Sequence, residues 1–227
     1  MPAEFIKFPT TPHLLWLGQS AVREDKVLTR AEAESFLSEP VTVEEKVDGA
    51  NVGISFDSQG NSRVQNRGNL VPLGTQGQFA PLWIWLEKHE NRLFDFLQDR
   101  LILFGEWCYA RHSIYYTQLP DFFLAFDIFD KCEQRFLCSP RRDEIVLAMA
   151  MVTVPKLRVG AVCVRDIPGM IGQSSLYEGL MEGIYLRREN VACVLSRAKV
   201  VRPQFVQQIG EHWSKQLLVP NRLRDFS

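Results

Sequence analysis

Hydrophobic and polar residues alternate along several short stretches of the chain, as they do in β-strands that bury one face. The alternation predicts strands over 41–46 and 52–56, and the turn DSQGN then leads to a hairpin partner at 62–67. Continuous apolar runs at 101–104 and 122–129 predict two further, buried strands. The first half of the chain is therefore expected to contain a substantial sheet.

Helical spacing of apolar residues marks other stretches. Between 78 and 100 the apolar positions recur every three to four residues, which predicts a helix with many aromatic side chains. Ser139 and Pro140 predict the start of a second helix, with serine as the N-cap and proline in the first turn. Pro203 predicts the start of a final helix over about 203–216.

The second half of the chain adds strands at 183–188 and 191–201, whereas 159–172 fits neither the strand nor the helical period. Strands and helices do not alternate regularly, so we expect an α+β fold of antiparallel sheets with flanking helices. No linker or shift in composition divides the sequence. We therefore expect a single minimal domain over 1–227, without an OB-fold or an appended C-terminal domain.

Composition narrows the class of protein. The chain has 227 residues, of which 46% are hydrophobic and 23% charged, as in ordinary globular proteins. Its net charge of −1 argues against a protein that coats long nucleic acids, so any such contact must be local. The five cysteines are odd in number, which argues against a disulfide framework. No apolar run approaches the ~20 residues of a membrane span, and we expect a cytoplasmic protein, or a nuclear one in a eukaryote.

A lysine at the end of the first predicted strand opens the string KVDGAN, residues 46–51. Gly49 would allow a phosphate-bearing ligand to approach the backbone closely. A lysine amine is a poor nucleophile at neutral pH because its pKa is about 10.4, but nearby cations and partial burial lower that value. Taken alone, the string also fits a surface lysine followed by an Asp-Gly turn.

Other short strings follow this lysine in order. Arg67 lies in NRG, Glu106 ends a buried strand in FGEW, Phe126 lies in FFLAFDIF, and Glu182 opens EGIY. The sequence RAK then places two cations, Arg197 and Lys199, on one face of a strand. Each of these residues, taken singly, also fits a structural or solvated role.

The order and spacing of these strings resemble the covalent nucleotidyltransferase superfamily, which contains DNA ligases, RNA ligases and mRNA capping enzymes. KxxGxN, FGE and FDI look most like RNA ligases of the nick-sealing and RNA-editing type, over about residues 41–205. The resemblance implies a ligase-type domain with a central nucleotide cleft, using ATP and Mg²⁺ or Mn²⁺. It implies RNA ends as partners, a 5′-phosphate and a 3′-hydroxyl, and leaves room for a separate nucleic-acid-binding protein.

The resemblance also implies catalytic roles. Lys46 would form a covalent lysyl-AMP, and AMP would then pass to an RNA 5′-phosphate before a 3′-hydroxyl seals the join. Lys199 and Arg197 would supply positive charge at the α-phosphate and lower the pKa of Lys46. Arg67 would hold the AMP phosphate or the incoming 5′-phosphate. Glu182 would bind the metal ion.

Further residues would bind the nucleotide. Glu106 would hold the ribose hydroxyls or the metal's water ligands, and Phe126 would stack on adenine. Asp48 and Asn51 would order metal-bound water and the lysine loop, and Glu44 completes the expected nucleotide-binding set.

Several alternatives stay open. Asp48 occupies a position that is also aspartate in DNA ligases and capping enzymes, so a minimal DNA ligase or a guanylyltransferase is an alternative. A catalytically weak module that binds nucleic-acid ends with a partner is another. Tyr109 and His112 fit a structural or substrate-contact role. The arginine pairs at 141–142 and 187–188 fit solvated faces or contacts with RNA phosphates.

Overall fold

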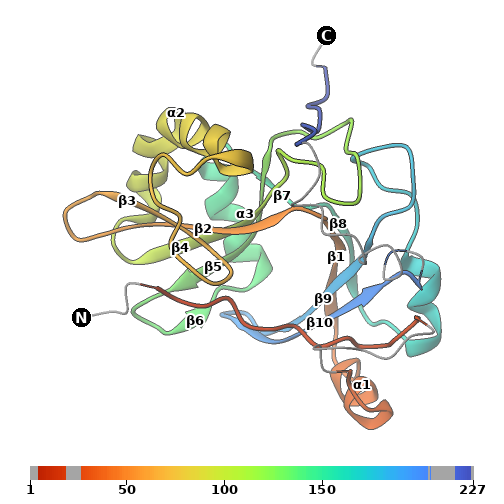
Figure 1. Ribbon diagram of the computed structural model, residues 1–227. Helices are drawn as coiled ribbons and strands as arrows, with labels where there is room; N and C mark the ends of the chain where they lie inside the picture. The colour runs from red at the N-terminus through yellow and green to blue at the C-terminus, as the bar shows by residue number, and fades with distance from the viewer. Residues whose placement is uncertain (1–4, 19–26, 204, 206–217, 226–227) are drawn as a thin grey trace.

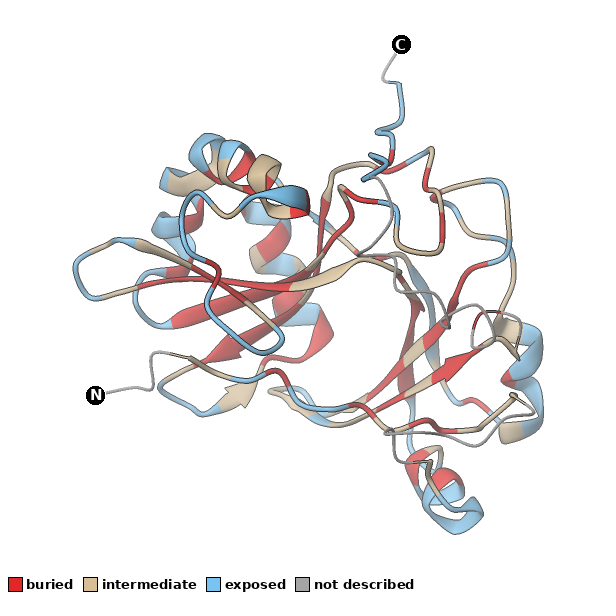
Figure 2. Ribbon diagram, viewed as in Figure 1, coloured by how far each residue is buried: buried red, intermediate tan, exposed pale blue. Residues whose placement is uncertain are grey.

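The computed structural model of the chain describes residues 5–18, 27–203, 205 and 218–225. Two mainly antiparallel sheets lie side by side, a six-stranded sheet that carries two helices and a four-stranded sheet (Figure 1). This arrangement confirms the predicted α+β fold of antiparallel sheets with flanking helices. Buried residues run along the strands of both sheets (Figure 2).

The six-stranded sheet has the order β3-β2-β4-β5-β6, and a short strand, β7, pairs in parallel with β5. The bounds of these strands are β2 (Ala50–Phe56), β3 (Ser62–Asn66), β4 (Leu101–Trp107), β5 (Phe123–Asp130), β6 (Arg135–Phe136) and β7 (Val152–Thr153). Alternate residues such as Val52 and Ile54 of β2 are fully buried, as the sequence pattern predicts.

Two helices pack on one face of this sheet. Helix α2 (Ala80–Leu97) follows a 3₁₀ turn at Gly77–Phe79 and buries Leu82, Leu86 and Leu93, so the predicted helix over 78–100 is confirmed in its main part. Helix α3 (Ser139–Ala148) begins one residue earlier than predicted. Its N-cap is Cys138, and the prediction of Ser139 as N-cap is wrong because the Ser139 hydroxyl instead donates to Glu189.

The four-stranded sheet has the order β10-β9-β1-β8. Its strands are β1 (Val41–Lys46), β8 (Lys156–Gly160), β9 (Gly183–Glu189) and β10 (Val194–Val201). The ambiguous stretch 159–172 contains the end of β8 and two 3₁₀ turns, η2 (Val164–Asp166) and η3 (Pro168–Met170). Helix α1 (Arg30–Phe36), which the hydrophobic pattern did not predict, packs Ala33 and Phe36 into the core of this sheet.

The N-terminal segment, residues 5–18, crosses both sheets (Figure 1). The carbonyl of Ile6 accepts a hydrogen bond from Gln65 of β3. Further along, the Lys199 amide of β10 donates to Pro12, and the Leu14 amide donates to the Lys199 carbonyl. This segment therefore ties the six-stranded sheet to the four-stranded sheet.

The structure also bears on the predicted final helix, the cysteines and the membrane-spanning character of the chain. Only Pro203 and Phe205 of the predicted final helix are described, and the remainder of 203–216 lies outside the described residues. All five cysteines are free, as expected. Among the helices of the described ranges, none combines the length and apolar character needed to cross a bilayer.

Candidate active site

Lys46 ends β1 and faces a carboxylate on the neighbouring strand. Lys46 pairs in register with Gly183, which places Glu182 at the adjacent start of β9. The Lys46 ammonium lies 2.6 Å from one Glu182 carboxylate oxygen and 2.7 Å from the other. Gly183 is required at this point, because a Cβ there would lie 2.0 Å from the Val200 carbonyl oxygen of β10. The strand register thus brings together two residues that are far apart in sequence.

A second carboxylate, that of Glu106, approaches from the six-stranded sheet. Glu106 lies opposite Asn51 in the pairing of β2 with β4, and it accepts a hydrogen bond of 3.0 Å from the Gly49 amide. A Cβ on Gly49 would lie 2.9 Å from the Glu106 side chain and 2.7 Å from the Trp107 carbonyl oxygen. Glycine at 49 therefore permits close contact between the lysine loop and β4.

Asp48 binds protein backbone rather than facing the cavity. Its Oδ2 accepts hydrogen bonds from the amides of Ser113 and Ile114, at 2.7 and 2.9 Å. Its own amide donates to the Tyr116 hydroxyl at 2.9 Å. His112 contacts Gln78 through Nε2, at 2.9 Å from Oε1. This geometry agrees with the predicted role of Asp48 in ordering the loop after Lys46. Its predicted role in ordering metal-bound water stays a prediction.

Between the two sheets lies a cavity of about 320 Å³. It contains seven of the residues that the sequence predicted for the site: Glu44, Lys46, Asn51, Arg67, Glu106, Phe126 and Lys199. Glu182 joins this group through its contact with Lys46. Asp48 and Arg197 are not among the residues that line the cavity.

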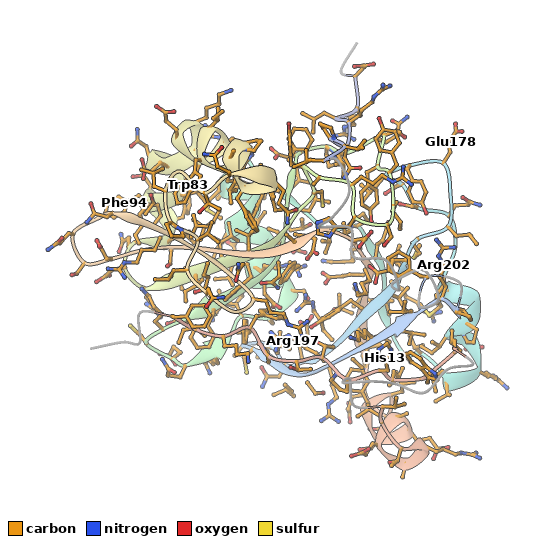
Figure 3. All side chains as sticks on the ribbon, viewed as in Figure 1. His13, Trp83, Phe94, Glu178, Arg197 and Arg202 are labelled. Carbon is orange, nitrogen blue, oxygen red and sulfur yellow. The ribbon has the colours of Figure 1, made fainter. Side chains whose placement is uncertain are left out.

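Arg197 is directed toward the six-stranded sheet. Its guanidinium lies 3.2 Å from Asp127 Oδ2 and 4.0 Å from the ring centre of Phe136. Figure 3 shows the residue where the β9–β10 hairpin reaches toward β5 and β6. Arg197 therefore does not line the cavity with Lys199, because an ion pair and an aromatic ring hold the guanidinium elsewhere. Its predicted place at the α-phosphate stays a prediction.

A buried ionic network forms the base of the cavity. Glu44 binds Arg142 of α3 at 2.6 Å and Arg187 of β9 at 2.7 Å. Arg187 also binds Asp127 of β5 at 2.7 Å. The side chains of Arg142 and Arg187 are 1% and 2% exposed, so the prediction of solvated or RNA-binding arginines at these two positions is wrong. Their carboxylate partners, which come from other parts of the chain, compensate the burial of charge.

Burial raises the pKa of both carboxyl groups beside Lys46. The pKa of Glu106 rises to about 8 and that of Glu182 to about 7, because burial penalises the charged form more than Lys46 favours it. Burial alone would lower the pKa of Lys46, but the surrounding carboxylates, first Glu182 and then Glu106, outweigh burial and raise it. The predicted lowering of the Lys46 pKa is therefore wrong for the protein groups taken alone.

The carboxylates of Glu106 and Glu182 suit a divalent cation that also binds phosphate oxygens of a substrate. Glu182 is buried and Glu106 is half-buried, and Lys46 does not fully offset the loss of hydration of the two carboxylates. A hard cation would add the positive charge that stabilises their ionised forms. Within the described ranges, no group of three or more histidine, cysteine, aspartate or glutamate side chains is arranged to hold a metal ion. Mg²⁺ fits such a site, since it is commonly bound by one or two carboxylates together with phosphate oxygens and water.

The structure adds site residues that the sequence analysis did not identify. Phe8 and Thr11 of the N-terminal segment line the cavity, together with Tyr185 and Arg187 of β9. Thr11 and Tyr185 share a hydrogen bond of 2.8 Å between their hydroxyls, and Phe8 packs edge-on against Phe126 at 5.3 Å. Strand alternation could have identified Tyr185 and Arg187, which share a face. No local pattern places Phe8 or Thr11.

Comparison with known proteins bears on this site. The sequence model of the family described as RNA ligase matches residues 39–201, a range that includes every predicted site residue. No curated protein sequence matches the chain significantly.

Solved structures of a Naegleria gruberi RNA ligase share the fold. The structure with PPi has a TM-score of 0.63 at 19% identity, covering 78% of this chain and 54% of that chain. A point mutant of the same ligase with ATP and Mn gives 0.60 at 17% identity, and another with AMP and Mn gives 0.61 at 17%, both with the same coverages of 78% and 54%. The present chain thus spans about half the length of these proteins.

Proposed function

Because the chain belongs to the RNA ligase family, we propose that it is an ATP-dependent RNA ligase that forms a covalent lysyl-AMP at Lys46. One observation carries the proposal: Lys46 lines a cavity together with Lys199 and the half-buried Glu106, and its amine contacts the buried carboxylate of Glu182. The Naegleria relatives with this fold were solved with ATP, AMP and Mn, which supports a nucleotide and a divalent metal as ligands.

In the first step, the Lys46 nitrogen attacks the α-phosphorus of ATP. A P–N bond forms, the P–O bond to the β-phosphate breaks, and pyrophosphate leaves. Lys199 and Arg67, which line the cavity with Lys46, would neutralise phosphate oxygens. The Lys46 amine must first lose a proton and leave Glu182.

Glu106 and Glu182 would hold the metal, which is Mg²⁺ or Mn²⁺. When bound, such an ion would neutralise phosphate charge and offset the carboxylates that raise the pKa of Lys46. Phe126 offers its ring to the nucleobase, and Phe8 packs against that ring from the N-terminal segment. Asn51 and Glu44 line the same cavity and complete the nucleotide-binding set.

Two further steps complete the proposed cycle. AMP passes from Lys46 to the 5′-phosphate of an RNA end, which forms a phosphoanhydride and releases the lysine. A 3′-hydroxyl then attacks that 5′-phosphate and AMP leaves, which seals the strand. Family membership supports RNA as the substrate. A separate nucleic-acid-binding protein is a further proposed partner.

Covalent labelling tests this proposal. The protein is incubated with α-labelled ATP and Mg²⁺ and then denatured, and bound label is counted. We expect label on the wild type and on Lys156→Ala, a lysine outside the cavity, but none on Lys46→Ala. An unlabelled wild type would refute the proposal. Label from GTP alone would indicate a guanylyltransferase, and sealing of nicked DNA but not of nicked RNA would indicate a DNA ligase.

A further inference from the structure

The C-terminal segment, residues 218–225, is bonded to the β4–β5 loop, residues 108–122 (Figure 1). The Arg111 amide donates to Val219 at 2.8 Å, and the Arg222 amide donates to Tyr116 at 2.9 Å. Between these contacts lies Asn221, which is only 3% exposed. A polar residue so deeply buried needs partners for each of its polar groups.

Asn221 finds those partners in the backbone of the β4–β5 loop. Its Nδ2 donates to the carbonyls of Cys108 and Ala110, at 2.8 and 3.2 Å. Its Oδ1 accepts from the Tyr116 amide at 2.9 Å, and its own amide donates to the Tyr109 carbonyl at 2.7 Å. A side-chain amide offers two donors and an acceptor on one planar group, and this loop uses all three.

The same loop holds the residues that follow the nucleophile. The hydroxyl of Tyr116, whose amide is bound by Asn221, accepts from the Asp48 amide at 2.9 Å. The Asp48 carboxylate in turn accepts from the amides of Ser113 and Ile114. Tyr116 is fully buried, so neither of its contacts is open to exchange with water. A continuous set of hydrogen bonds therefore leads from Asn221 to the backbone two residues beyond Lys46.

We propose that Asn221 is a positioning residue for nucleotidyl transfer, acting through the β4–β5 loop and Tyr116 to fix the loop that aims the Lys46 amine. The C-terminal segment then belongs to the catalytic apparatus, although it lies outside the range matched by the family model. This inference rests on the proposed function. Asn221 should affect the position of the Lys46 amine and not the binding of the base, because Phe8 and Phe126, which would contact the base, lie on other elements.

Replacing Asn221 by alanine would leave two carbonyls and one amide of a buried loop without partners. Such unpaired groups are costly, so the loop would move toward water and release Tyr116 from Asp48. Small displacements of a nucleophile slow a reaction without preventing binding of the substrate. The expected signature is a loss of rate at saturating ATP with little change in ATP affinity.

The test compares Asn221→Ala with Asn190→Ala, whose side chain also bonds backbone amides but in the β9–β10 turn. We expect the labelling rate at saturating ATP to fall ~10-fold or more in Asn221→Ala, with half-saturating ATP unchanged within about 3-fold. Hydrogen exchange at the amides of 48–49 and 108–116 should rise in the same variant. Asn190→Ala should change neither the labelling rate nor exchange in these segments.

Tyr116→Phe is a second variant, which removes only the hydroxyl that accepts from the Asp48 amide. It keeps the test decisive if Asn221→Ala does not fold. It should slow labelling at saturating ATP in the same way, and combining it with Asn221→Ala should add little further loss, because the two residues act through one connection. If the wild type takes label and both variants label at the wild-type rate, the inference is overturned but the proposed function stands. The same holds if the variants lose ATP affinity together with the labelling rate. A wild type that takes no label would overturn the proposed function, and this inference with it.

Discussion

The ammonium nitrogen of Lys46 lies 2.6 Å from Oε1 and 2.7 Å from Oε2 of Glu182. The proposed nucleophile and the proposed metal ligand are therefore each other's partners among the protein groups. A lysine in such a pair is held protonated, and only an unprotonated amine can attack phosphorus. In the proposed mechanism the Lys46 amine would therefore have to lose its proton and leave Glu182, and a metal ion held by Glu182 would supply the positive charge in its place.

Glu182→Gln should remove the metal ligand while keeping the shape of the side chain. An amide is a weaker ligand than a carboxylate for a hard cation, so we expect labelling from ATP to fall ~100-fold or more. The measurement is the initial labelling rate as a function of Mg²⁺ concentration. Glu178→Gln is the matched control, an exposed glutamate four residues earlier in the chain (Figure 3). Labelling of Glu182→Gln at the wild-type rate would remove Glu182 from the site.

Glu106 should make stability fall as pH rises. In the folded chain it keeps its proton up to a pKa of about 8, because of burial, against an ordinary value of 4.5 that applies to the unfolded chain. Folding therefore takes up a proton between these values, and each pH unit there lowers the stability by up to about 1.4 kcal/mol.

Melting curves with a chelator present measure this effect. The wild type should lose melting temperature relative to Glu106→Gln between about pH 5 and 8, and the difference should then level off. The exposed Glu87→Gln should melt in parallel with the wild type at every pH. A constant difference between Glu106→Gln and the wild type would show that Glu106 ionises normally in the folded chain.

Phe126→Ala should weaken ATP binding more than it slows the chemical step. Stacking of a base on an aromatic ring is worth about 1–3 kcal/mol, so half-saturating ATP should rise roughly 10- to 100-fold. The rate at saturating ATP should change much less, because the ring of Phe126 would contact the base and supplies no group to the reacting phosphate. Phe94→Ala, which removes an exposed ring that is not part of the cavity lining, should leave both values unchanged. Unchanged ATP affinity in Phe126→Ala would place the base elsewhere.

The sequence predicted those site residues that lie in a short motif next to a recognisable strand. Lys46, Glu106 and Glu182 each lie at or near the end of a strand that its own hydrophobic pattern predicts. Antiparallel pairing of those strands then brings them together. Helix α1 was also accessible from sequence, because Thr29 and Glu32 form a capping box.

The site features that the sequence did not predict depend on contacts between residues that are distant in sequence. Arg187 has the local pattern of a surface charge, and only Glu44 and Asp127, from other strands, make its burial tolerable. Phe8 lines the cavity because its segment pairs with β10, which no periodicity over a few residues reveals. Asn221 has the local character of a turn residue, and its function depends on a loop more than a hundred positions earlier, since it bonds Cys108 across a separation of 113.

Arg197 and Lys199 offer a direct test of geometry against family resemblance. They lie two residues apart on β10, yet only Lys199 lines the cavity, whereas Arg197 binds Asp127 and covers Phe136. Lys199→Met should therefore reduce labelling ~100-fold, because it removes a positive charge from the proposed phosphate site. Arg197→Met should leave the labelling rate within about 3-fold of the wild type and lower stability by about 1 kcal/mol, or roughly 2–4 °C in melting temperature. Equal losses of labelling in the two variants, with unchanged melting, would mean that Arg197 turns to the phosphate when ATP binds.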